Sequence, residues 1–264
     1  MSDYSTLELD VSRAGLAVVL LNRPDKRNAM NALVIEELAD VFDALSKSPE
    51  VRLVLLRGAG ATFSAGADLE WMRAAADYTR DQNEEDALAL AEMLRKLYSM
   101  PQTTIAMVHG AAIGGGAGLV SACDIAIAHR DTTFQFSEVR LGLTPATISP
   151  FVIEAIGPRW ARALFVSADR FDTEFAEKIG LVHYSVADET EMEETAERLA
   201  RLVFGAAPGA IADAKDLVAD FTGEIIDASL SHKTAKRIAA RRASAEGREG
   251  IAAFLSKRKP NWAN

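Results

Sequence analysis

Short apolar runs, separated by longer amphipathic stretches, recur through about the first 150 residues of the chain. The apolar runs predict strands at residues 51–56, 103–108, 125–128 and 133–136, and residues 11–21 predict a strand or a hairpin with a turn at 14–15. Arg52 alone interrupts the run at 51–56, which is typical of a strand covered on both faces.

Between these strands, apolar residues recur at helical spacing. Asn31 can cap a helix whose apolar stripe contains Val34, Leu38, Val41, Phe42 and Leu45. Residues 82–98 predict a second helix, and a third follows the glycine-rich turn after residue 108 and ends near residue 123. The polar stretch 77–86 fits either a mobile loop or a solvated helix start.

From residue 149 onward the pattern becomes mostly helical. Asp172 can cap a short helix that Gly180 ends, and one strand is predicted at 181–186. The longer helices are predicted at 189–204, 209–221, 224–245 and 249–257. The chain therefore combines a β/α part with a mostly α part, and neither a sharp linker nor a repeat separates them.

Composition and charge then narrow the classes of function. The 264 residues carry a net charge of −9, which argues against nucleic-acid or membrane-surface binding. No signal-peptide pattern and no apolar run of membrane-spanning length is found, so we expect a cytoplasmic protein. The single cysteine, Cys123, excludes an internal disulfide and is expected to be a buried structural thiol, and the scattered histidines predict no metal site.

Two turns made of small residues, at 63–69 and 109–119, each follow a predicted strand and lead into a helical pattern. Small residues let the main chain approach a ligand, and the first N–H groups of a helix have no partner inside it. Two such turns could direct two N–H donors at one developing negative charge, as carbonyl chemistry requires. The alternative is that the glycines only allow close packing of helix against strand.

Known glycine and serine motifs do not fit these turns. No Gly-Lys-Ser/Thr follows them, and Leu119 stands where a G-x-G-x-x-G motif needs its last glycine. Ser121 invites a peptidase interpretation, but no suitably spaced histidine accompanies it. His109 could line a site beside the second turn, although a local hydrogen bond at the end of a strand is the simpler expectation.

A third segment, Ser137-Glu-Val-Arg-Leu-Gly142, completes a recognisable set with Ser64-Ala-Gly-Ala-Asp-Leu69 and the run from Gly110 to Gly116. In this order the three motifs resemble the enoyl-CoA hydratase/isomerase (crotonase) family, and the match extends over nearly the whole chain. The resemblance implies an α/β fold, a crotonase-like spiral of ββα units (1–200) followed by a C-terminal helical trimerisation region (201–264). It also implies a homo-oligomer, a trimer or a hexamer.

The resemblance further implies an acyl-CoA thioester substrate, with coenzyme A as part of that substrate and with no separate cofactor or metal. By motif match, the N–H groups of Ala67 and Gly115 form an oxyanion hole and Glu138 is the catalytic glutamate. The other residues assigned to substrate binding are Asp68, Leu69, Trp71, Gly114, Gly118, Lys26, Arg27 and Lys257.

One departure from the family pattern concerns Gly118, which stands where many hydratases carry a second glutamate that holds the attacking water. The segment 146–151 also replaces the usual glycine-rich continuation, and Trp71-Met72 follows the first turn. These features are similar to bacterial 3-methylglutaconyl-CoA hydratases. They favour a hydratase for branched or carboxylated acyl chains, as in leucine degradation or fatty acid metabolism.

Two alternatives stay open. A single glutamate also suits a Δ3-Δ2 enoyl-CoA isomerase, in which one base moves a proton between C2 and C4. A weaker alternative is a non-catalytic acyl-CoA- or RNA-binding protein, because residues 232–259 are rich in Lys and Arg.

The residues themselves also single out Glu138, the only acidic residue between Asp131 and Glu154, because it lies between apolar segments. Burial there would raise its pKa toward a range useful for proton transfer, whereas a salt bridge to Arg140 would make it structural. Of the other acidic residues near the turns, Asp124 is expected to anchor the next strand and Glu70 remains open.

The basic group Arg23, Lys26 and Arg27, and a second one at 257–259, could each bind CoA phosphates or simply face solvent.

Overall fold

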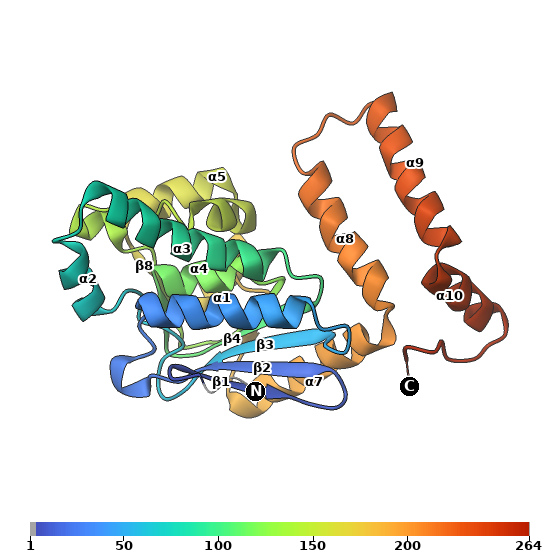
Figure 1. The fold of residues 1–264 in the computed structure, drawn as a ribbon, viewed down its shortest axis with the longest axis horizontal. Coiled ribbons are helices and arrows are strands. Elements are labelled where there is room, and N and C mark those ends of the chain that lie inside the picture. The colour runs from blue at the N-terminus through green and yellow to red at the C-terminus, as the bar shows by residue number, and fades with distance from the viewer. Residues whose placement is uncertain (1–3, 264) are drawn as a thin grey trace. The chain divides into compact units, whose positions relative to one another are not determined.

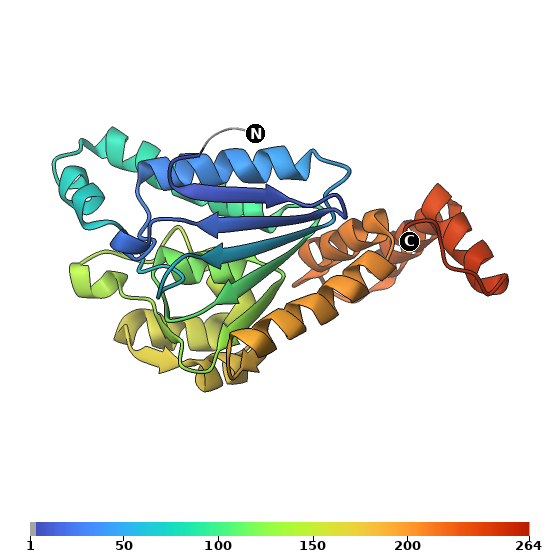
Figure 2. The same ribbon diagram turned by 90° about the horizontal axis from the view of Figure 1, so that it is seen from below.

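The computed structural model describes residues 4–263, drawn as ribbons in Figures 1 and 2. Contacts divide the described chain into two compact units. The first contains residues up to 100 and residues 104–197, and the second contains residues 101–103 and those from 198 onward. Helix α7 (Glu189–Gly205) crosses the division, and the predicted boundary between residues 200 and 201 falls within this helix.

The first unit is built on two sheets. The six-stranded sheet contains, in spatial order, β1 (Leu7–Val11), β2 (Leu16–Leu21), β3 (Leu53–Gly58), β4 (Thr103–Val108), β6 (Ile125–His129) and β9 (Tyr184–Val186). Figure 2 shows the first four strands of this sheet side by side. The pair β1–β2 is antiparallel, whereas β2–β3, β4–β6 and β6–β9 are parallel. A three-stranded sheet contains β5 (Ala111–Ile113), β7 (Thr133–Gln135) and β8 (Arg170–Asp172) in that order.

Helices α1 (Ala32–Ser46) and α3 (Arg80–Tyr98) lie side by side over one face of the larger sheet (Figure 1). The Asn31 side chain caps α1 by accepting from the N–H of Val34, as predicted. Thr79 and Gln82 form a capping box at the start of α3, so the polar stretch at 77–86 contains a solvated helix start. The remaining helices of this unit before α7 are α2 (Leu69–Ala75), α4 (Gly115–Ala122), α5 (Ser149–Ser167) and α6 (Thr173–Ile179).

From residue 198 onward, the described part of the second unit is mostly helical, with the end of α7 followed by α8 (Pro208–Phe221), α9 (Ala228–Ala243) and α10 (Ala245–Leu255). Asp227 and Ser244 cap α9 and α10 through their side chains. Arg241 ties three parts of the unit together, because its guanidinium donates to Asp213, to Glu246 and to the carbonyl oxygen of Gly209.

Several predicted bounds were wrong. Strand β1 begins at Leu7 rather than at residue 11, and β3 runs over Leu53–Gly58 rather than 51–56. Strand β9 is shorter than predicted, and α9 begins at Ala228 rather than at residue 224. Helix α2 follows the first turn, where a helical pattern was predicted without bounds. The short strands β5 and β8 were not predicted, because three residues carry too little periodicity for a sequence pattern.

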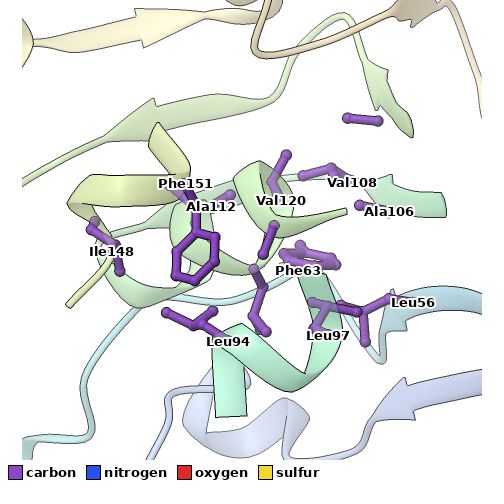
Figure 3. Packing of buried hydrophobic residues seen from close by; sticks show 14 of the residues in the cluster. Leu56, Phe63, Leu94, Leu97, Ala106, Val108, Ala112, Val120, Ile148 and Phe151 are labelled. Atoms are coloured by element: carbon purple, nitrogen blue, oxygen red, sulfur yellow. The ribbon is translucent and has the colours of Figure 1, made fainter. Parts of the chain in front are cut away.

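The core of the first unit surrounds α4, the helix that follows the second turn. Figure 3 shows Leu94 and Leu97 of α3, Val120 of α4 and Phe63 packed together, with Ile148 and Phe151 beside them. Buried side chains of this size each contribute roughly 1.5–3 kcal/mol. The glycine turn that begins α4 is therefore held on a rigid, well-packed base.

Candidate active site

The first turn is fixed to strand β5 by main-chain hydrogen bonds. Ser64 donates its N–H to Ala111 O over 3.0 Å, and its own carbonyl oxygen accepts from Ile113 N–H over 3.0 Å. Gly66 adopts a φ of +91°, and a Cβ there would lie 2.9 Å from Ile113 O. This position therefore needs glycine, and the exposed Ala67 follows directly. Because β5 leads into the second turn, the two turns are connected through one strand.

The second turn begins helix α4. Gly114 has a φ of +51° and donates its N–H to Gln135 O of β7 over 2.8 Å. Gly115 is the first residue of α4, where a helix has no internal partner for the N–H group. Among the described residues, no hydrogen bond is found for the N–H of Gly115 or for that of Ala67. Ala67 in the first turn and Gly115 in the second therefore each present an unused main-chain donor.

Met30 links the two unused donors. Its N–H donates to Gly66 O over 2.7 Å, and its carbonyl oxygen accepts from Asp68 N–H over 2.8 Å, so Met30 bridges Ala67 in parallel register. At the same time, a Cβ built on Gly115 would lie 2.2 Å from Met30 Cε. A single buried residue therefore contacts both turns and holds them beside each other.

Glu138 lies over the second turn. It begins a 3₁₀ turn, Glu138–Leu141, and a Cβ built on Gly114 would lie 3.1 Å from its Oε1. Its Oε2 is buried and has no hydrogen-bond partner within residues 4–263. Burial raises the pKa of Glu138, and its own main-chain N–H offsets only part of that effect. No ion pair joins Glu138 to Arg140 in the described part of the chain. The salt bridge that would give Glu138 a purely structural role is therefore not observed.

The other acidic residues near the turns already have hydrogen-bond or ion-pair partners within the protein. Asp68 is 4% exposed, accepts from Arg23 over 2.9 Å through Oδ2 and from Glu70 N–H over 2.8 Å through Oδ1. Asp124 accepts from the N–H and the hydroxyl of Thr104, which confirms its expected role as an anchor of strand β6. Glu70 is exposed and faces Lys26 over 3.4 Å.

The structure leaves no space for a side chain at Gly118, the position where many hydratases of the family carry a second glutamate. Gly118 is buried, and a Cβ there would lie 2.4 Å from Ile148 Cγ2 and 3.7 Å from Leu94 Cδ1. No side chain fits at residue 118 unless Ile148 moves. Ile148 comes from the segment 146–151 that departs from the family pattern, so the two departures are in contact with each other.

The remaining predicted binding residues are spread more widely. Leu69 is 70% exposed at the start of α2, whereas Trp71 is half-buried and donates its Nε1–H to Asp86 over 3.0 Å. Lys26 and Arg27 are exposed on the segment before Met30. Lys257 is exposed in the second unit. Contact of these residues and of Asp68 with substrate stays a prediction, but Arg23 is engaged by Asp68 rather than open for a phosphate.

Two residues that sequence reasoning did not place in the site are Met30 and Ile148. Neither belongs to a motif, and each acts through a side-chain contact that only folding creates. Ser121 donates its hydroxyl to Ala117 O inside α4. The Nε2 atom of His109 lies 2.9 Å from Gly60 O, 49 residues away in the chain, rather than making the expected local hydrogen bond, so neither residue forms a nucleophile pair. Cys123 is partly exposed, not buried as expected, because it follows the last residue of α4. No group of metal-binding side chains is found within residues 4–263.

Comparison with known proteins identifies the family of this chain. The model of the enoyl-CoA hydratase/isomerase family matches residues 12–264. The solved structure of an enoyl-CoA hydratase from Shewanella pealeana has a TM-score of 0.95 and 37% identity to this chain, and covers 98% of this chain and 97% of its own. An enoyl-CoA hydratase/isomerase from Marinobacter aquaeolei has a TM-score of 0.92 and 35% identity, with 98% and 99% covered.

A mouse protein, the mitochondrial Delta(3,5)-Delta(2,4)-dienoyl-CoA isomerase, is 32% identical over 243 residues, which is 87% of this chain and 73% of that protein. The predicted crotonase-like α/β fold with helices at the C-terminal end is confirmed by these similarities. The chain belongs to the enoyl-CoA hydratase/isomerase family.

Proposed function

We propose that this protein is an enoyl-CoA hydratase, which adds water to the double bond of a 2-enoyl-CoA thioester. The observation that carries the proposal is the pair of unused N–H donors at Ala67 and Gly115, linked through Met30, beside the unpartnered carboxylate oxygen of Glu138. The donors form an oxyanion hole for the thioester oxygen, and Glu138 moves the protons.

The reaction divides into two proton transfers. Glu138 accepts a proton from water while the water oxygen bonds to C3, and the π electrons shift until the negative charge lies on the thioester oxygen. The N–H groups of Ala67 and Gly115 bind that charge more tightly than the neutral carbonyl, and one such donor is worth about 3–4 kcal/mol of barrier. The enolate then collapses, and C2 takes the proton back from the Glu138 carboxyl group.

A single carboxylate restricts the substrate. Because Gly118 is closed by Ile148, no second glutamate can hold the water there. A substrate that carries its own carboxylate can supply that acceptor. We therefore favour branched or carboxylated 2-enoyl thioesters of the 3-methylglutaconyl-CoA kind.

Turnover of a panel of enoyl-CoA thioesters, followed by mass spectrometry, tests the proposal. We expect hydration of the branched, carboxylated members, and Glu138→Gln should lower kcat by roughly 10²–10⁴-fold because general acid–base catalysis contributes that much. Binding of a CoA thioester should persist in this variant. Near-normal turnover by Glu138→Gln would remove Glu138 from the mechanism.

The Gly115 donor can be tested with a matched pair of variants. Gly115→Pro removes the N–H at a helix position that tolerates proline, and Met30→Ala makes room for the added atoms. Against a control of Gly115→Ala with Met30→Ala, the proline variant should lose about 10²–10³-fold in kcat. Equal rates in the two double variants contradict the oxyanion hole.

The second candidate is a Δ3-Δ2 enoyl-CoA isomerase. The same observation favours it, because Glu138 is the single carboxylate and Ile148 leaves no room for a second one at Gly118. In that reaction Glu138 takes a proton from C2 of a 3-enoyl thioester and returns it to C4, with the enolate held as before. Incubation of a 3-enoyl-CoA in deuterated water separates the two. A 2-enoyl product without a hydroxy product favours the isomerase, and failure to convert argues against it.

We also propose that the protein is a homo-oligomer, a trimer or a hexamer, in the cytoplasm. The support is a set of large apolar side chains that the second unit leaves exposed: Leu202, Val218, Ile225, Ile226, Ile238, Ile251, Phe254 and Leu255. Within residues 4–263, no helix has both the length and the apolar character for a membrane span. Light scattering on the purified protein measures the oligomer, and a monomeric mass at micromolar concentration would overturn this proposal.

A further inference from the structure

The segment before Met30 holds the Ala67 turn along its whole length. Ala65 donates its N–H to Arg27 O over 3.0 Å, and the hydroxyl of Ser64 donates to Asn28 O over 2.9 Å. Together with the two bonds at Met30, these contacts fix both neighbours of Ala67 while its own N–H stays unused. The direction of this N–H is therefore set by its neighbours.

Arg23 closes this arrangement with its side chain. One guanidinium nitrogen donates to Ala29 O over 2.6 Å, and the other donates to Asp68 Oδ2 over 2.9 Å. Ala29 precedes Met30, and Asp68 follows Ala67. The planar, forked guanidinium group of Arg23 therefore spans both segments of the isolated Met30–Ala67 bridge. A guanidinium suits this task because its donors keep a fixed geometry.

Arg23 is itself held in place. Its N–H donates to Asn28 Oδ1 over 2.9 Å, and its carbonyl oxygen accepts from Asn28 N–H over 2.9 Å. The buried Asn28 also donates through Nδ2 to Ala59 O and Thr62 O. The Arg23 fork thus connects the Ala67 turn to a buried polar network.

On these contacts we propose that Arg23 and Asp68 are positioning residues that fix the direction of the Ala67 N–H in the oxyanion hole, an inference that rests on the proposed function. A misplacement of about 1 Å in a catalytic group can cost about 100-fold in rate. Loss of the fork lets the Ala67 segment shift, so polarisation of the thioester carbonyl and kcat fall together. Affinity for the CoA portion of the ligand changes less.

The test uses a chromophoric ligand, dimethylaminocinnamoyl-CoA, whose absorption moves to longer wavelength when donors polarise its thioester carbonyl. The variants are Arg23→Met, Arg23→Lys and Asp68→Asn, with kcat measured on the best enoyl-CoA substrate. We expect Arg23→Met to lose most of the wavelength shift and about 10–100-fold in kcat. Arg23→Lys keeps the charge opposite Asp68 without the fork, so both readings should fall between wild type and Arg23→Met.

Glu37→Gln is the matched control for lost stability. Glu37 is a buried carboxylate outside the site that accepts from Ser5 N–H, Thr6 N–H and the Thr6 hydroxyl. This variant should melt at a lower temperature while it keeps the full wavelength shift and kcat. If Arg23→Met does not fold, Arg23→Lys carries the test.

The outcomes separate the two levels of the argument. A wild-type protein that leaves the bound chromophore unshifted overturns the oxyanion hole, and the positioning role with it. A shifted wild type whose Arg23 variants match it in wavelength and kcat overturns the positioning role alone. Glu138→Gln should bind the chromophore with the full shift, because it leaves the donors in place.

Discussion

Two carboxylates beside the glycine turns have opposite surroundings. Asp68 is buried with both oxygens bonded, one to Arg23 and one to the N–H of Glu70. Glu138 has a buried Oε2 without a partner in the described part of the chain. Burial alone would raise the pKa of Asp68, but the hydrogen bonds from Glu70 N–H and Arg23 outweigh it and lower that pKa, whereas burial raises the pKa of Glu138.

This difference in hydrogen bonding distinguishes the carboxylate of Asp68, which stabilises the structure, from that of Glu138, which can take part in proton transfer. A satisfied carboxylate stays ionised and fixes its neighbours, because each hydrogen bond favours the charged form. An unsatisfied buried carboxylate costs free energy in the native state, and proteins retain such groups mainly where chemistry uses them. Asp68 and Glu138 thus contribute to one site in different ways.

The largest expected effect on stability follows from Asp68→Asn. This variant weakens the bond to Arg23, and hydrogen bonds to charged groups contribute about 1.5–3 kcal/mol each. We expect a loss of that size in the free energy of unfolding, measured by urea titration at neutral pH. Because the pKa of Asp68 is lowered by folding, the loss should shrink as the pH falls through that pKa. A variant as stable as wild type would mean that the pair is not structural.

Glu138→Gln should change stability in the opposite direction. A carboxyl group whose pKa is raised by folding stabilises the native state below its unfolded pKa, and this contribution is lost as the pH rises through the folded pKa. Once ionised, the buried Glu138 therefore destabilises the native state, and the neutral glutamine should raise the melting temperature. Calorimetry at neutral and acidic pH measures this gain, which should fade in acid. A lower melting temperature at neutral pH would contradict the comparison.

The pH dependence of rate gives the smallest effect. Glu138 must be ionised to accept a proton, so kcat/KM should rise with pH through its pKa. Because burial raises that pKa, the rise should occur at higher pH than for an ordinary glutamate. Asp68→Asn should leave the pH of this rise unchanged. A change in that pH in the Asp68→Asn variant would show that the titrations of the two carboxylates are coupled.

The sequence by itself determined much of this protein. Periodic apolar residues predicted α1 and α3, because each is long enough for its pattern to repeat, and a continuous apolar run predicted β4. Asn31 predicted a cap that the structure confirms. The motifs around Ala67, Gly115 and Glu138 indicated the family, because the glycines and a carboxylate between apolar segments can be identified from the sequence alone. The structure then showed that Gly66 and Gly114 adopt positive φ values.

Only the tertiary structure decided how these motifs meet. Met30 contacts both turns, Ile148 closes the space at Gly118, and Arg23 pairs with Asp68 over a separation of 45 residues. None of these contacts can be predicted from a periodic pattern in the sequence, because each depends on side chains from segments that are distant in the chain. The same reason hid the difference between the two carboxylates, since an acid is satisfied or unsatisfied only by the groups that folding brings to it.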